Sequence, residues 1–140
     1  MDLLDGFGFE LPTGIEYGPG SLAGLGPILD ELRVSRLLLI SDPGLRDAGV
    51  LSSVLETPGL RERHVEVFLD VSPNPKDVEA EAGAEKARVM EAEALIAVGG
   101  GSVLDCAKAV SVLAPQGGRC RDHEARGSIG PEILPLFAVP

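Results

Sequence analysis

The chain alternates between short, almost entirely apolar runs and longer segments whose apolar residues recur at helical spacing. Four apolar runs predict strands: Arg36–Ile40, Val65–Val71, Ala94–Val98 and Leu134–Val139. Three intervening segments predict helices: Leu45–Leu55, Pro75–Met90 and Ser102–Leu113. Because the apolar runs are continuous rather than alternating, they suit strands covered on both faces. Strands that alternate with helices predict an α/β fold with a parallel sheet and right-handed crossovers.

Capping and turn residues place several boundaries within this pattern. Asn74 can act as the N-cap of the helix Pro75–Met90, and a proline suits the first helical position. Near the N-terminus, Ile15–Ser21 predicts a short strand and a turn, followed by a helix capped by Ser21. Two glycines and a proline make that helix weak. The segment Pro115–Gly130, rich in Gly and Arg, predicts a surface loop.

The composition is that of an ordinary globular domain. With 140 residues, 44% hydrophobic and 24% charged, the chain is long enough for about one domain with a substantial core. Its formal net charge of −10 disfavours a nucleic acid or an anionic membrane as partner. The sequence has no apolar run of membrane-spanning length, and its N-terminus lacks the features of a signal peptide. The cytoplasm is therefore the expected location.

Cysteines and histidines are few and scattered. Cys106 and Cys120 have no paired spacing and are expected to be reduced thiols, while His64 and His123 lie far apart in the sequence. A metal site made from this chain alone is not expected, and no residue is assigned a catalytic or metal-binding role.

One junction carries most of the candidate chemistry. An apolar strand runs directly into a helix through three consecutive glycines: Gly99, Gly100 and Gly101. Glycines allow a sharp turn and a close approach of phosphate, and the unpaired N–H groups of a helix N-terminus attract anions. Ser102 and Asp105 have the spacing of a capping box. The junction predicts a pyrophosphate site, although a plain tight turn would use the same residues and the G-x-G-x-x-G pattern is absent.

Two further polar residues follow predicted strands. Asp42 comes directly after Arg36–Ile40, where an acidic side chain can accept hydrogen bonds from a cofactor ribose. Ser41-Asp-Pro-Gly44 is equally a good turn sequence. Asn74 follows the next strand, at an edge where ligands collect in open α/β sheets, but an N-cap role explains it without a ligand.

Several of these motifs, in order, resemble those of the iron-containing (group III) alcohol dehydrogenases. Gly99 to Lys108 resembles the family signature G-G-G-S-x-x-D-x-A-K, Ser41 to Leu45 its ribose-binding turn, and Val71 to Pro75 its P-N-P turn. Ile15 to Leu22 is similar to the opening of the family, and Leu134 to Pro140 to the strand before its T-T-A-G-T-G-S-E run. The resemblance covers nearly the whole chain.

The resemblance implies an α/β domain with a Rossmann-like parallel sheet and helices on both faces, spanning residues 1–140 and binding NAD. It implies that Asp42 selects NAD over NADP and that Gly100, Gly101 and Ser102 hold the pyrophosphate, with Gly99 in the same loop. Asn74 and Asp105 match further cofactor-site positions. The family reaction is hydride transfer between NAD and the carbon of an alcohol or aldehyde, with iron or zinc polarising the substrate oxygen.

The chain departs from the family at its C-terminal end. It stops at Pro140, before the T-T-A-G-T-G-S-E run and the helical second domain with its one Asp and three His metal ligands. The expectation is a truncated cofactor-binding domain that does not catalyse by itself and that would need a full-length form to hold iron or zinc. The alternatives are a stand-alone nucleotide-binding or interaction module, or a polyol or glycerol dehydrogenase relative. Surfaces left uncovered, and a strand near Ile15 that resembles one pairing between subunits, predict a homodimer or larger assembly.

Overall fold

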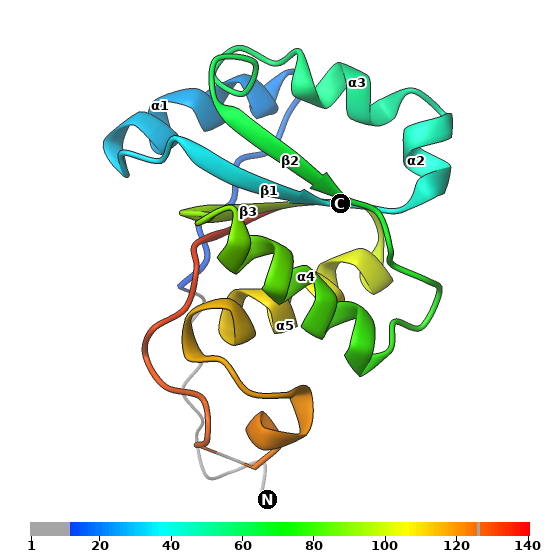
Figure 1. Cartoon of the computed structure of the whole chain (residues 1–140). Helices are drawn as coiled ribbons and strands as arrows, with labels where there is room; N and C mark the ends of the chain where they lie inside the picture. The colour runs from blue at the N-terminus through cyan, green and yellow to red at the C-terminus, as the bar shows by residue number, and fades with distance from the viewer. Residues whose placement is uncertain (1–11, 126) are drawn as a thin grey trace, which may run out of the picture.

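The computed structural model describes residues 12–125 and 127–140, in which four parallel strands form one sheet (Figure 1). The strands lie in the order β2-β1-β3-β4. Their bounds are β1 Arg36–Ile40, β2 His64–Phe68, β3 Ala94–Val98 and β4 Leu136–Val139. All three neighbouring pairs are parallel, so the predicted α/β fold with a parallel sheet is confirmed.

Helices cover both faces of this sheet, as the sequence predicted (Figure 1). On one face lie α4 (Asp77–Val89) and α5 (Gly101–Gln116), packed on alternate residues of β1 and β3. On the other face lie α1 (Leu25–Glu31), α2 (Pro43–Asp47) and α3 (Val50–Leu55). Short 3₁₀ helices at Ser21–Gly24 and Cys120–His123 complete the described elements.

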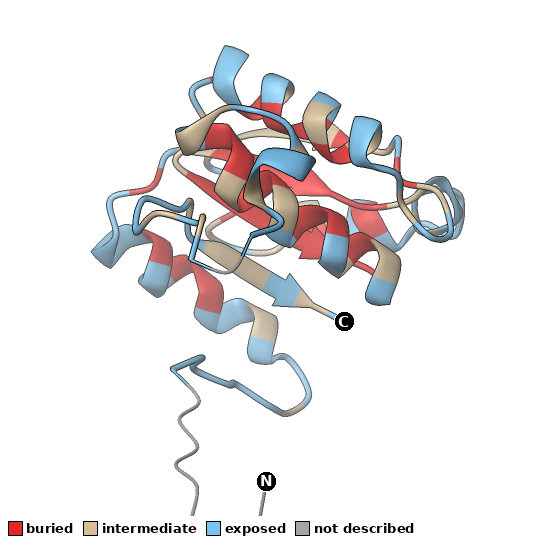
Figure 2. Ribbon diagram, turned by 90° about the horizontal axis from the view of Figure 1, so that it is seen from below, coloured by how far each residue is buried: buried red, intermediate tan, exposed pale blue. Residues whose placement is uncertain are grey.

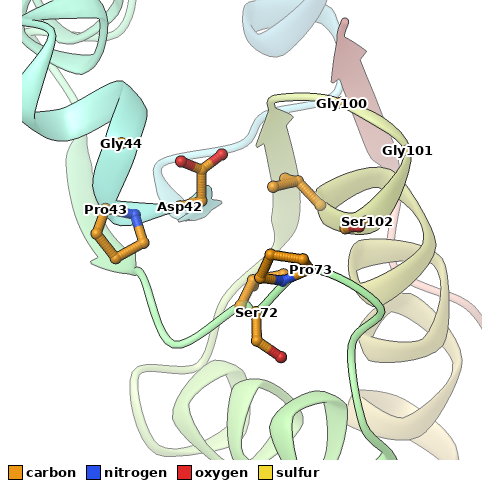
Figure 3. Close-up of a pocket in the computed structure, with 10 residues that line it drawn as sticks. Asp42, Pro43, Gly44, Ser72, Pro73, Gly100, Gly101 and Ser102 are labelled. Atoms are coloured by element: carbon orange, nitrogen blue, oxygen red, sulfur yellow. The ribbon is translucent and has the colours of Figure 1, made fainter.

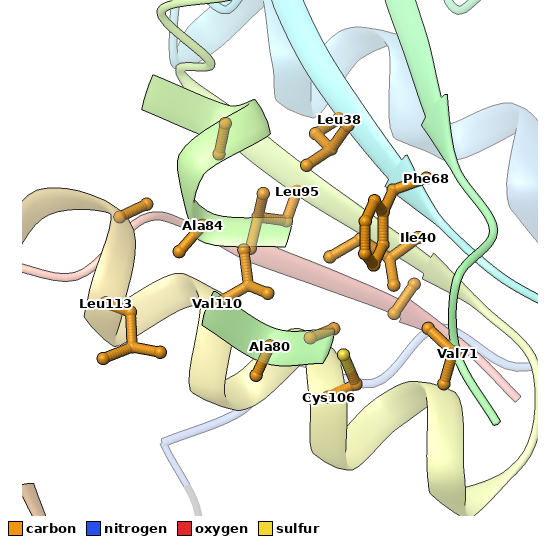
Figure 4. Packing of buried hydrophobic residues seen from close by; sticks show 14 of the residues in the cluster. Leu38, Ile40, Phe68, Val71, Ala80, Ala84, Leu95, Cys106, Val110 and Leu113 are labelled. Carbon is orange, nitrogen blue, oxygen red and sulfur yellow. The ribbon is translucent and has the colours of Figure 1, made fainter. Parts of the chain in front are cut away.

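The larger of the two core clusters lies where α4 and α5 pack on the sheet (Figure 4). Val110 of α5 and Phe68 of β2 close around Gly83 of α4, where a Cβ would come within 2.9 Å of Val110 Cγ2. Burial is complete along β3 and nearly so along β1, whereas the edge strands β2 and β4 are half-exposed (Figure 2). The prediction of strands covered on both faces therefore holds for the two central strands and is wrong for the edges.

Several predicted boundaries are wrong, each for a local reason. The expected helix Leu45–Leu55 is two helices, because Gly49 adopts φ +77° between them. Asn74 is not an N-cap, and its backbone adopts φ +55°. The helix α4 begins at Asp77 instead. Its N-cap is Lys76, whose N–H donates to the Glu79 carboxylate at 2.7 Å. The predicted strand within Ile15–Ser21 is absent from the described structure, where residues 12–17 are irregular.

Other predicted ends are shifted. The strand predicted over Val65–Val71 runs over His64–Phe68, and that predicted over Leu134–Val139 begins at Leu136. The helix predicted to end at Leu113 continues to Gln116, with Pro115 inside its last turn. The 3₁₀ helix at the N-terminal end follows Gly20 in a left-handed conformation, so Ser21 is its first residue rather than its cap.

Candidate functional site

The carboxyl ends of β1 and β3 form the natural ligand crevice of this fold. After β1 the chain turns toward α2 on one face, and after β3 it turns toward α5 on the other face. Where neighbouring parallel strands diverge in this way, the loops separate and leave a crevice that α/β proteins use for ligands. A hollow of about 470 Å³ occupies this position (Figure 3). It is lined by Asp42, Pro43, Gly44, Val71, Ser72, Pro73, Gly100, Gly101, Ser102 and Val103.

Of the three consecutive glycines, one is packed against the protein and two face open space. Gly99 is buried at φ +151°, and a Cβ there would lie 2.7 Å from Val103 Cγ2. At Gly100 and Gly101 a Cβ would meet nothing within 4 Å, so these two residues border open space in the hollow. Of these three residues, only Gly99 therefore needs to be glycine for the fold.

The N-terminus of α5 opens onto this space. The helix begins at Gly101, and its N-cap, Gly100, contributes no side chain. The predicted capping box is wrong. Asp105 instead pairs with Lys108 at 3.1 Å, and Ser102 Oγ accepts the N–H of Asn74 at 3.3 Å. The positive end of a 16-residue helix thus faces the hollow without a carboxylate cap from its own first turn.

Asp42 lies between α2 and the hollow. Its Oδ1 accepts the N–H of Leu45 at 3.1 Å, so it is the N-cap of α2. Its half-buried carboxylate also lines the hollow and points into the space between α2 and the glycine loop (Figure 3). A carboxylate has acceptor positions for several donors, so capping does not exhaust it.

Two predicted site residues lie outside the hollow. Asn74 is exposed and contacts the site through its backbone N–H to Ser102. Asp105 borders a separate depression of about 160 Å³, together with Cys106 and Cys120. Sequence reasoning missed Ser72 and Pro73, although their place after a strand was a usable signal. The Ser72 hydroxyl is the main cause that lowers the pKa of the Glu79 carboxyl, and the Lys76 N–H is the second. The turn after β2 therefore interacts with the first turn of α4.

The described residues do not offer an iron or zinc site. Within residues 12–125 and 127–140 no group of three or more His, Cys, Asp or Glu is arranged to hold a metal ion. His64 Nε2 lies 3.4 Å from Glu66 Oε1 at the amino end of β2, and His123 Nε2 lies 3.0 Å from the carbonyl oxygen of Gly117. Burial raises the pKa of Cys106 to about 11, so this thiol is neutral at pH 7. In the same part of the chain, none of the helices has the length and apolar character needed to cross a membrane.

A parallel sheet with a glycine loop and an acidic residue at its point of strand divergence is an arrangement typical of dinucleotide-binding α/β domains. The comparison with known families is specific. The model of the iron-containing alcohol dehydrogenase family matches residues 12–140, and the chain belongs to that family.

Individual relatives agree with this assignment. The choline dehydrogenase of Bacillus subtilis is 39% identical over 137 residues, covering 94% of this chain and 34% of that protein. A sulfoacetaldehyde reductase from Bifidobacterium kashiwanohense in complex with NAD+ superposes with a TM-score of 0.86 at 26% identity, over 96% of this chain and 35% of the other. The NADH-dependent butanol dehydrogenase A of Thermotoga maritima superposes with a TM-score of 0.82 at 30% identity. The match covers 95% of this chain and 34% of that protein. The chain thus spans about a third of the length of these proteins.

Proposed function

We propose that this domain binds NAD in the hollow at the carboxyl ends of β1 and β3. The pyrophosphate lies against Gly100, Gly101 and Ser102 at the N-terminus of α5, and the ribose hydroxyls donate to Asp42. Gly99 shapes the loop. Asn74 and Asp105 lie outside the hollow, so we propose them only as contacts at the border of the site.

One observation carries the proposal: an uncapped helix N-terminus and a carboxylate face each other across one hollow. The first attracts a phosphate and the second accepts hydroxyl donors, which is the polarity of the adenosine half of NAD. The NAD+ complex of the sulfoacetaldehyde reductase and the NADH dependence of the butanol dehydrogenase support the same ligand.

We further propose that the domain serves hydride transfer between NAD and an alcohol or aldehyde carbon. In this family a divalent metal supplies the Lewis acid that polarises the substrate oxygen. The described residues do not provide its ligands, so their part is to bind and orient the cofactor. The 140-residue chain is therefore proposed to be inactive alone, and metal-dependent alcohol oxidation by the pure chain would contradict this.

Calorimetric titration of the chain with NAD, and separately with NADP, tests the proposal. NAD should bind more tightly than NADP, because Asp42 repels the additional phosphate. Gly101→Val should abolish binding while leaving the fold intact, since a side chain there enters open space that the pyrophosphate needs. Gly14→Val is the matched control, because a Cβ at Gly14 also meets nothing within 4 Å. Absence of NAD binding to the unmodified chain at millimolar concentration would overturn the proposal.

We also propose a cytoplasmic protein that forms a homodimer or a larger assembly. Its two cysteines, Cys106 and Cys120, are free, in keeping with a reducing compartment. Ile15 is 72% exposed and Tyr17 98% exposed, on an irregular segment whose apolar side chains invite a partner. A monomer mass by light scattering at micromolar concentration would contradict self-association.

A further inference from the structure

Ser41 is the most deeply buried polar residue beside the hollow. It follows β1 directly, has no exposed surface, and is one of two buried polar residues in the described chain. Its Oγ donates to the carbonyl oxygen of Val98 at 2.6 Å, and its backbone N–H donates to the carbonyl oxygen of Phe68 at 3.0 Å. Ser41 therefore connects β1 to the carboxyl ends of both neighbouring strands.

The Ser41–Val98 bond lies where the sheet begins to separate. The backbone pairing between β1 and β3 ends at Ile40 and Ala97. Beyond these residues the two segments continue to helices on opposite faces of the sheet. The hydroxyl bond extends the connection between the two strands by one residue. Asp42 follows Ser41 on one side, and the glycine loop follows Val98 on the other.

We infer that Ser41 is a positioning residue for the dinucleotide, fixing Asp42 relative to Gly100 and Gly101. The inference rests on the proposed function. NAD must contact both sides of the hollow at once, so its affinity depends on the spacing between them, whereas a fragment that contacts one side does not depend on it. Removing the hydroxyl leaves each side intact and loosens their relative position.

The test is Ser41→Ala in the 140-residue chain, titrated with NAD, with adenosine and with inorganic pyrophosphate. NAD affinity should fall by up to about tenfold, because loss of alignment should cost no more than the hydrogen bond that maintains it. The affinities for adenosine and for pyrophosphate should each change by less than about twofold, because each fragment uses one side only. In an Asp42→Asn background the effect of Ser41→Ala on NAD should shrink, since the group that it positions is weakened.

Ser111→Ala is the matched control. Ser111 is also buried, and its Oγ donates to a backbone carbonyl, that of Lys108, at 2.7 Å, but it lies in α5 away from the hollow. This variant should bind NAD as the unmodified chain does. All titrations are made at a temperature where circular dichroism shows each variant folded. Ser41→Cys, with a similar shape and a weak donor, should give an intermediate affinity and serves if the alanine variant does not fold.

The outcomes separate this inference from the proposed function. No NAD binding by the unmodified chain overturns the proposed function itself. Unchanged NAD affinity in Ser41→Ala, or in Ser41→Cys if that variant is used, overturns the positioning role while leaving the site in place. An equal loss for NAD and for both fragments shows general loosening of the fold and also overturns the inference.

Discussion

The amino end of the parallel sheet and the start of α5 at its carboxyl end treat their backbone donors in opposite ways. At the amino end, the Glu93 carboxylate before β3 accepts the N–H groups of Ser35 and Arg36 at 2.6 and 2.9 Å and the Ser35 hydroxyl at 3.0 Å. Its other oxygen pairs with the Arg36 guanidinium at 3.0 Å. At the carboxyl end, α5 begins with no side-chain cap, and Gly100 and Gly101 border open space.

The difference separates a structural end of the sheet from the end at which we propose that the cofactor binds. Both ends present N–H groups that favour an anion. At the amino end Glu93 supplies one, and at the carboxyl end Asp42 supplies one to α2, but the first turn of α5 receives none from its own side chains. A protein that satisfied both ends internally would gain stability and lose its ligand site. The open carboxyl end is therefore the place where an external anion can contribute what Glu93 contributes at the amino end.

The largest expected effect distinguishes two glycines within the carboxyl end itself. Gly99→Ala places a Cβ 2.7 Å from Val103 Cγ2 at φ +151°, and should lower the free energy of unfolding by about 2–4 kcal/mol. Gly101→Ala meets nothing within 4 Å and should change it by less than about 0.5 kcal/mol. Urea unfolding of the two variants measures both values. Equal losses would show that the loop is structural throughout, and the contrast between its glycines would be wrong.

The next effect tests the internal anion at the amino end. Glu93→Ala removes the acceptor of two backbone N–H groups, and should lower the free energy of unfolding by about 1–2 kcal/mol after allowance for solvent screening. NAD affinity should stay unchanged, because Glu93 lies at the end of the sheet opposite the hollow. Glu91→Ala is a suitable control. Glu91 stands two residues earlier, and its hydrogen bonds to Arg36 and Arg88 are made by its backbone, which alanine retains. A larger loss of NAD binding than of stability would break the comparison between the two ends.

The sequence was sufficient for the central strands and for the glycine junction. Five-residue apolar runs are buried wherever they lie in the middle of the sheet, so Arg36–Ile40 and Ala94–Val98 were predicted with their observed bounds. The bounds of edge strands are harder to predict from the sequence, because a strand that is partly exposed does not require apolar residues at every position. This is why the ends of β2 and β4 were misplaced.

The polar details of the site depended on tertiary contacts that local patterns do not contain. Ser102 and Asp105 had the spacing of a capping box, but Ser102 Oγ accepts the N–H of Asn74, 28 residues away in the sequence. Asp105 pairs with Lys108 in the same helix, which is a local competitor rather than a tertiary contact. Asn74 suited an N-cap, yet its left-handed backbone makes it part of a turn. Ser41 was noted only as the first residue of a turn motif, and nothing local indicated its bond to Val98, which is 57 residues away in the sequence.

A smaller effect separates the two roles of Asp42 at the binding end. Asp42→Asn keeps an Oδ1 that can accept the Leu45 N–H, so α2 should remain capped and stability nearly unchanged. The loss of negative charge should narrow the preference for NAD over NADP by about five- to tenfold, a change of about 1 kcal/mol. Asp42→Ala removes both roles and should also lower the unfolding midpoint. A preference for NAD that survives in the asparagine variant would assign the residue to capping alone.

The smallest expected effect is the pH dependence of the amino end. The N–H groups of Ser35 and then Arg36 lower the pKa of the Glu93 carboxyl below its ordinary 4.5. A carboxyl whose pKa is lowered by folding stabilises the protein fully above pH 4.5, and this contribution is lost as the pH falls through the lower value of the folded state. The stability difference between the unmodified chain and Glu93→Gln should therefore be constant from pH 6 to about pH 5 and shrink toward pH 3. Glu79, whose pKa is also lowered, is present in both proteins and cancels from the difference. A difference that does not change with pH would mean that folding leaves the pKa of Glu93 unchanged, and that the charge of this carboxylate does not contribute to closing this end of the sheet.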